Sequence, residues 1–305
     1  MMLLQHKIKP IKKGWLPAVD GHEIFYHTYG NPEGEPVLIF HSATGGRSEP
    51  TDAKKYNLKK YYLIMFDQRG CGSSQFKDLL YKNTPMDIVS DTKRLLETLN
   101  ISQKITLTGH SWGAFMALLF AETYPELISK IWISSVFLAR YRDNQEWWDQ
   151  DAIRFYPDFI SILQEKAGDQ EITDYFATEL LSGDKKRERE AMKYYGSLES
   201  IVGDTAPRFT IPDDKNYDKE LSANKIYVNM AINHFFLGDN YIIENAYRIK
   251  HIPTKIFHNR LDLCCPFEQA WELHNVLPHS ELYVIPASGH SSPEMEKRLK
   301  ELFNS

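Results

Sequence analysis

The chain has 305 residues, of which 42% are hydrophobic and 13% aromatic, enough to bury a large core in one domain or two. Its 36 basic and 41 acidic residues give a net charge of −5, too mild and mixed to indicate nucleic acid as a partner. Three cysteines, two of them adjacent, do not make a disulfide framework, and no apolar run approaches the length of a signal peptide or a membrane span. We therefore expect a cytoplasmic protein with neither a nucleic-acid nor a membrane partner.

The first third of the chain alternates between strand and helix signals. Trp15–Val19 and Glu23–Tyr29 flank the turn residues Asp20-Gly21 and predict an antiparallel hairpin. Further strands are predicted at Val37–Phe40, Tyr61–Phe66, Ile105–Thr108 and Lys130–Ser134, with helical stretches between them. This alternation is typical of an α/β fold, in which crossover helices connect the strands of a parallel sheet.

The character of the sequence changes between residues 138 and 250. Strand signals disappear there, and long helical stretches rich in Trp, Tyr, Phe and charged residues replace them. Two more strands follow, at Thr254–His258 and Glu281–Ile285. We therefore expect residues 1–137 and 251–305 to form the α/β core, and residues 138–250 to form an inserted helical cap over the active site.

A candidate nucleophile lies in the run Gly-His-Ser-Trp-Gly at residues 109–113. This run follows the predicted strand Ile105–Thr108 and precedes an apolar, alanine-rich stretch at Ala114–Ala121, the strand, sharp turn and helix of a nucleophile elbow. Strand and helix pass close together on either side of the serine, so the residues two before and two after it must be glycine. Ser111 is therefore predicted to be held above a helix N-terminus, where developing negative charge is favoured.

The other members of a catalytic triad follow in the order Ser, Asp, His that α/β-hydrolases use. Asp262 comes shortly after the predicted strand Thr254–His258, and His290 comes shortly after Glu281–Ile285. Both would lie on the sheet edge that carries the serine. We expect His290 to act as general base and Asp262 to fix its tautomer and stabilise the imidazolium.

An oxyanion hole is predicted at the turn after the strand Glu35–Phe40. Such turns supply one backbone N–H donor, and the residue after the nucleophile supplies the other. The sequence predicts Trp112 N–H as one donor and Ala43 N–H as the second, with Ser42 as the alternative.

These residues resemble the proline iminopeptidases, α/β-hydrolases that release N-terminal proline from peptides. The resemblance is sharpest at Asp67–Ser73, which reads Asp-Gln-Arg-Gly-Cys-Gly-Ser, and it extends to Gly14–Leu16, Arg260–Asp262 and Cys265-Pro266. It is poorest in the middle third of the chain. It implies an α/β-hydrolase fold, with a mostly parallel eight-stranded sheet flanked by helices and an inserted helical cap.

The chain also departs from that family. Residues 41–45 read His-Ser-Ala-Thr-Gly where the family usually has His-Gly-Gly-Pro-Gly, and the residue before Ser111 is histidine rather than glycine. Two cap glutamates hold the substrate's amino group in the family. Glu199 matches one of them, but Ile232 stands at the other, just before the Asn-His-Phe-Phe run that contains His234. The resemblance makes these three residues the candidates for substrate binding.

Three functions remain open on the sequence alone. The first is a serine hydrolase that forms an acyl-enzyme and releases N-terminal proline from small peptides. The second is a carboxylesterase or lactonase of the same fold that acts on small molecules. The third is a ligand-binding protein with a hydrolase fold and no turnover. Because no zinc-type His/Glu pair, P-loop or dinucleotide glycine motif occurs, we expect no metal and no cofactor.

Overall fold

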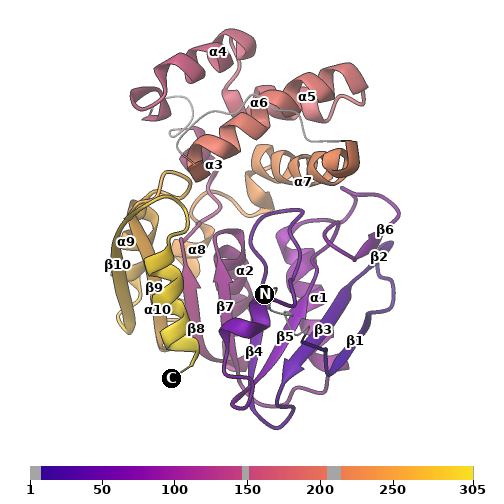
Figure 1. The fold of residues 1–305 in the computed structure, drawn as a ribbon, viewed down its shortest axis with the longest axis vertical. Helices are drawn as coiled ribbons and strands as arrows, with labels where there is room; N and C mark the ends of the chain where they lie inside the picture. Colours follow the sequence, from indigo (N-terminus) through magenta and orange to yellow (C-terminus); the bar gives the residue numbers. More distant parts are fainter. Residues whose placement is uncertain (1–7, 146–150, 205–213, 305) are drawn as a thin grey trace, which may run out of the picture.

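Eight strands form one sheet in the order β1-β3-β5-β4-β7-β8-β9-β10 in the computed structural model, which describes residues 8–145, 151–204 and 214–304 (Figure 1). Antiparallel pairing joins β1 to β3 and β3 to β5, and every other pair is parallel. The predicted α/β-hydrolase fold with an eight-stranded, mostly parallel sheet is confirmed. The strands of this sheet are β1 (Lys12–Trp15), β3 (Phe25–Gly30), β4 (Glu35–Phe40), β5 (Tyr61–Phe66), β7 (Ile105–His110), β8 (Ile128–Ser134), β9 (Thr254–Leu261) and β10 (Ser280–Ser288). A separate two-stranded ladder pairs β2 (His22–Glu23) with β6 (Gln75–Phe76).

The central strands are buried on both faces, which explains their continuous apolar sequences. In β5 every residue is buried, and successive side chains point to opposite faces. Leu63 belongs to the cluster that also holds Trp132 and Phe303, whereas Ile64 belongs to the cluster that also holds Phe115.

Helices cover both faces of the sheet and one of its ends. The helices packed in the larger core cluster are α1 (Pro85–Thr98), α2 (Trp112–Thr123), α8 (Tyr241–Asn245) and α9 (Phe267–Val276), and α10 (Pro293–Phe303) packs on the opposite face. The remaining helices are α3 (Tyr141–Gln145), α4 (Pro157–Ala167), α5 (Ile172–Leu180), α6 (Lys185–Asp204) and α7 (Asp214–Ile232). Figure 1 shows α4 to α7 gathered at one end of the sheet, apart from the helices that lie along it.

These end helices have a core of their own. Side chains of α4, α5 and α6 form a separate buried cluster, which Val228 of α7 joins. On its other side α7 packs with the sheet core through Ile226 and Met230. The chain after α7 returns to that same core at Phe235 and Ile242. The division of the chain at residues 137 and 250 stays a prediction.

The opening hairpin differs from its prediction in part. Asp20 and Gly21 form the expected turn, with φ angles of 53° and 84°, and Val19 and His22 exchange two backbone hydrogen bonds across it. The strand that pairs with β3, however, lies earlier than predicted and ends at Trp15. Pro17 explains the difference, because proline has no N–H to donate to the ladder. Within the described residues, no helix is long and apolar enough to cross a membrane.

A buried acid near the end of α2 has no partner for its charge. Glu122 is 1% exposed, and neither of its carboxylate oxygens has a hydrogen-bond partner among the described residues. Burial therefore raises the pKa of Glu122 to about 9, which Arg248 lowers only in part. The carboxyl group is neutral in the folded protein at neutral pH.

This acid makes stability depend on pH. Between the ordinary pKa of 4.5 and the raised value of about 9, the folded protein keeps a proton that the unfolded chain has lost. Stability therefore falls as the pH rises through this window, by up to about 1.4 kcal/mol per pH unit. We predict that Glu122→Gln stabilises the protein more at pH 8 than at pH 5, as measured by urea denaturation. The exposed Glu126→Gln variant is the control, and an equal effect of Glu122→Gln at both pH values would contradict the assignment.

Candidate active site

The structure places Ser111 in a strained turn between β7 and α2. Its backbone has φ 57° and ψ −121°, a conformation that non-glycine residues rarely adopt. A Cβ atom on Gly109 would lie 2.1 Å from the carbonyl oxygen of Gly113, and one on Gly113 would lie 2.4 Å from that of Phe40. Both positions therefore require glycine, as the sequence predicts. This is the geometry of a nucleophile elbow.

Asp262 and His290 meet beside this turn. His290 Nδ1 lies 3.0 Å and 3.2 Å from the two carboxylate oxygens of Asp262, which is buried. The carboxylate also accepts the backbone N–H groups of Cys264 and Cys265 at 2.9 and 3.0 Å. Burial opposes the charge on Asp262, but the hydrogen bond and charge of His290 and the N–H of Cys265 outweigh it and lower the pKa of this carboxyl. The aspartate therefore stays ionised.

Two adjacent cysteines, Cys264 and Cys265, lie between this pair and the serine. Within the described residues no hydrogen bond joins Ser111 to His290; the Ser111 hydroxyl instead interacts with the thiol of Cys265. A hydrogen bond from Cys265 and the charge of His290 lower the pKa of Cys264 to about 5. Burial opposes protonation of His290, but Cys264 and Asp262 outweigh it and raise its pKa well above the ordinary value. Catalytic hydrogen bonds often form only once substrate is bound.

The turn after β4 brings a second backbone donor to the serine. Ala43 has φ 63°, and it lines the same cavity as Ser111 and Trp112. Neither the N–H of Ala43 nor that of Trp112 donates a hydrogen bond to any described residue, so both are free to bind an oxyanion. Ser42, the alternative, lines a different cavity.

Gln68 connects the turn after β4 to the start of α2 by hydrogen bonds, a role that sequence reasoning did not reveal. Its side chain accepts a hydrogen bond from Trp112 Nε1 at 2.7 Å and donates one to the carbonyl oxygen of His41 at 3.2 Å. Its backbone N–H donates to His41 Nε2 at 3.1 Å. Burial lowers the pKa of His41, so the ring is neutral and can accept this bond.

The rest of the Asp67–Ser73 segment adds to this connection. One carboxylate oxygen of Asp67 accepts both the N–H and the hydroxyl of Ser48 at 2.7 Å, and the other accepts the N–H of Ser73 at 2.7 Å. The N–H of Gly45 donates to the sulfur of Cys71 at 3.1 Å. The stretch that carries the family resemblance is therefore a buried polar support for the turn after β4.

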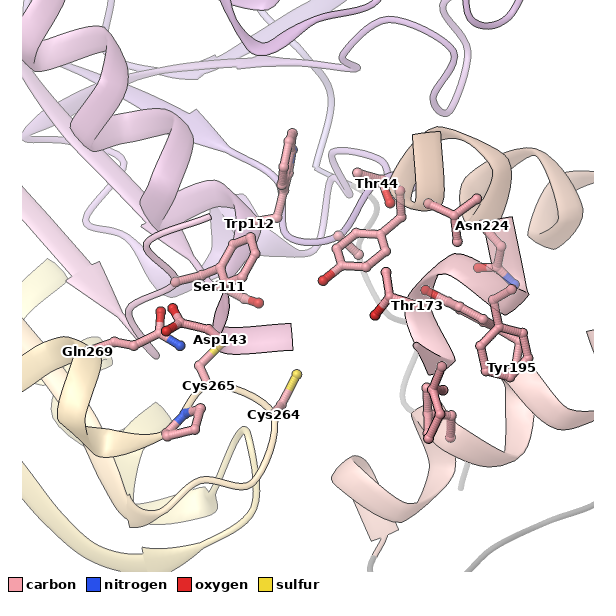
Figure 2. A pocket seen from close by; sticks show the side chains of 18 residues that line it. Thr44, Ser111, Trp112, Asp143, Thr173, Tyr195, Asn224, Cys264, Cys265 and Gln269 are labelled. Carbon is pink, nitrogen blue, oxygen red and sulfur yellow. The ribbon is translucent and has the colours of Figure 1, made fainter. Parts of the chain in front are cut away.

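A cavity of about 180 Å³ opens above Ser111, between the sheet edge and the end helices. Figure 2 shows Ser111, Cys264 and Cys265 on one side and Thr173, Tyr195 and Asn224 on the other. Its further lining residues include Phe137, Ile172, Phe176, Leu198, Tyr227, Val228, Pro266 and Gln269. The cavity is therefore mainly apolar.

Asp143 is the carboxylate among the described lining residues, and sequence reasoning did not identify it. Burial raises its pKa, and a hydrogen bond from Arg140 at 2.8 Å offsets only part of that effect. No local pattern marks this residue, because its place in the cavity depends on the packing of α3. It is a candidate for binding a cationic group of a substrate.

None of the three substrate-binding candidates is among the described residues that line this cavity. Glu199 falls within α6, one residue after the lining residue Leu198, but its side chain lies outside the described part of the chain. Ile232 packs against the core of the end helices and does not line the cavity. His234 is exposed, with Nδ1 3.2 Å from a carboxylate oxygen of Asp239. The roles of all three residues stay predictions.

Comparison with known proteins identifies the fold and the family. A family model described as alpha/beta hydrolase fold matches residues 35–296. A protein from Leptolyngbya boryana named a probable proline iminopeptidase is 34% identical over 306 residues, which cover 96% of this chain and 93% of that protein. A proline iminopeptidase from Xylella fastidiosa is 30% identical over 300 residues, covering 96% and 95%. An esterase from Exiguobacterium antarcticum has a TM-score of 0.63 at 20% identity, covering 95% and 98%, which shows the shared fold alone.

A strained serine turn on an eight-stranded, mostly parallel sheet defines the class of α/β-hydrolases. Within that class, the near full-length similarity to curated relatives decides the family. The chain belongs to the proline iminopeptidase family.

The hydrogen bonds of Gln68 can be tested by removing its side chain. We predict that Gln68→Ala lowers kcat by about 10- to 100-fold, because His41 and Trp112 lose the side chain that holds their two segments together. KM should change less, since the donors matter most when the oxyanion forms. Steady-state kinetics on an aryl substrate measures both constants.

The exposed Gln75→Ala variant in β6 serves as the matched control. An unchanged kcat in a folded Gln68→Ala protein would show that the turn holds its shape without this side chain.

Proposed function

We propose that this chain is a serine aminopeptidase that releases N-terminal proline from short peptides through an acyl-enzyme at Ser111. The observation that carries the proposal is the strained turn of Ser111, which lines the cavity, together with the hydrogen-bonded pair of His290 and Asp262 beside that turn. The proline iminopeptidase relatives support the choice of substrate.

Each residue then has a defined role. Ser111 attacks the carbonyl carbon of the scissile bond while His290 takes its proton. The N–H groups of Trp112 and Ala43 stabilise the tetrahedral oxyanion, helped by the N-terminus of α2. His290 next protonates the leaving amine, and water then cleaves the acyl-enzyme with His290 again as base. Asp262 keeps the ring of His290 oriented and stabilises its charged form.

The attack requires a small rearrangement at the serine. The Ser111 hydroxyl must turn from Cys265 to His290. The proton that the interaction with Cys264 favours on the ring of His290 must return to the sulfur of Cys264, so that a neutral imidazole can accept the serine proton. Substrate entering the cavity supplies the reason, because its carbonyl group occupies the space next to these thiols. The hydrogen bond between Ser111 and His290 therefore forms when substrate binds and is not present beforehand.

The cavity suits a small apolar ring with one positive charge. Phe137, Phe176 and Val228 offer apolar contacts of the kind that a pyrrolidine ring requires. A free amino group buried there needs a carboxylate, since an unpaired ammonium costs several kcal/mol. We assign this role to Glu199 by its match to the family and to Asp143 by its place in the lining. The cap at residues 138–250 would supply both.

A neutral ester or lactone is the second candidate substrate. Ile232 replaces one of the two family carboxylates, and Arg140 already pairs with the charge of Asp143. Both features weaken the attraction for an ammonium group and leave the acyl-enzyme chemistry unchanged.

The three cysteines are free, which supports the cytoplasm as the location of the enzyme.

The first test concerns the nucleophile and its base. Ser111→Ala and His290→Ala should each lower kcat by about four to six orders of magnitude, because the two residues act as one unit. The double variant should be hardly worse than either single variant. Labelling by a fluorophosphonate probe should disappear in Ser111→Ala, while circular dichroism shows the fold retained. Near-normal turnover by this variant would rule out the mechanism.

The second test distinguishes peptide from ester substrates. Glu199→Gln and Asp143→Asn should each lower kcat/KM for a proline arylamide by about 2–3 kcal/mol, equivalent to about 30- to 150-fold, if the carboxylate holds the ammonium group. The same variants should hardly change kcat/KM for a short-chain aryl ester, which carries no ammonium group.

Ile232→Leu, at a position that packs outside the cavity lining, is the control and should change neither activity. If neither carboxylate variant affects the arylamide and the parent enzyme prefers the ester, the second candidate replaces the first.

A further inference from the structure

Three potential metal ligands meet beside the triad. The sulfur atoms of Cys264 and Cys265 and a ring nitrogen of His290 all lie within 4.8 Å of one another. Figure 2 shows the sulfur of Cys264 directed into the cavity above Ser111. Cys264 and His290 are partly exposed, so an ion can reach the cluster from that cavity.

The donor set selects the kind of ion. Two thiolates and one imidazole suit zinc, and soft thiolate ligands exclude magnesium and calcium. The two negative charges of the thiolates balance the charge of a divalent ion. Three protein ligands leave the fourth tetrahedral position open toward the cavity.

The residues around the ligands already hold them in place. Asp262 accepts the Nδ1–H of His290 at 3.0 Å, so the other ring nitrogen is the one available to a metal. The same carboxylate accepts the backbone N–H groups of Cys264 and Cys265. A carboxylate that orients a ligating histidine is the usual support of a protein zinc site. Here one aspartate anchors all three ligands.

We propose that Cys264, Cys265 and His290 form a reversible zinc site that inhibits the hydrolase. Binding forms two Zn–S bonds and one Zn–N bond and releases the thiol protons to solvent, with no change of oxidation state. The ion then occupies the nitrogen of His290 that would take the proton of Ser111. The inhibition rests on the proposed function, whereas the metal binding does not.

Cobalt is the probe for the site itself. Metal-free protein titrated with Co²⁺ should develop a thiolate-to-cobalt charge-transfer band with one ion per chain, and Zn²⁺ should abolish it. The band should persist in Ser111→Ala, which separates metal binding from catalysis. Cys264→Ser and Cys265→Ser should each weaken binding by about 100-fold or more, and His290→Ala should weaken it while keeping both thiols. Cys71→Ser, at the third cysteine, should bind as the parent does.

Inhibition is measured separately, by fluorophosphonate labelling of Ser111 with increasing Zn²⁺. Labelling of the parent should fall with the occupancy that the cobalt titration defines, and a chelator should restore it. In Cys264→Ser, labelling relative to its own metal-free rate should resist about 100-fold more Zn²⁺.

Three results would overturn the proposal or its inhibitory part. Without a charge-transfer band in the parent, or with equal bands in Cys264→Ser and Cys265→Ser, there is no site. A band without loss of labelling would overturn the inhibitory role. If the parent enzyme is not labelled even without metal, the proposed function fails and the cobalt result still stands.

Discussion

The buried carboxylate of Asp262 is the interaction on which the active site depends. It accepts hydrogen bonds from the side chain of His290 and from the backbone N–H groups of Cys264 and Cys265. One ionised group therefore orients the ring of His290 and shapes the loop that follows β9. Because burial makes an unpaired charge costly, the loop, the histidine and the aspartate are stable only together. The same arrangement that fixes the ring of His290 also brings two sulfur atoms next to it.

The oxyanion turn is supported by a different set of buried polar groups. Asp67 holds Ser48 and Ser73, and Gln68 connects His41 to Trp112. The segment is conspicuous in the sequence, yet it contributes no side chain to the cavity lining. Its hydrogen bonds fix the backbone of the turn after β4, and a backbone donor of the kind we propose at Ala43 is effective only when its position is fixed before the oxyanion forms. The support and the turn must therefore be understood as one unit.

Local signals account for most of what the sequence predicts correctly. The strand at β5 and the glycines around Ser111 follow from periodicity and from steric demands within a few residues. Asp262 and His290 each follow a strand of the sheet, in the order Ser, Asp, His along the chain, and this order also predicts that the two side chains meet at one edge of the sheet. The partners of Asp143 and the interaction between Ser111 and Cys265 are not predictable in this way, since they depend on how distant segments pack. The turn at Asp20-Gly21 is predicted correctly, but the strand before it ends at Trp15, two residues before Pro17, and not at Val19.

The end helices are coupled to the oxyanion turn by direct contact. A Cβ atom on Gly45 would lie 2.1 Å from the Cβ of Ala223 in α7, and the φ of Gly45 is +75°. Thr44 donates its hydroxyl to the carbonyl oxygen of Ala223 at 3.2 Å. The turn that presents Ala43 therefore packs against the helix that also lines the cavity through Asn224 and Val228. With the N–H of Ala43 as the oxyanion donor that we propose, a shift of α7 that admits a different substrate also moves this donor, so substrate selectivity and rate would change together.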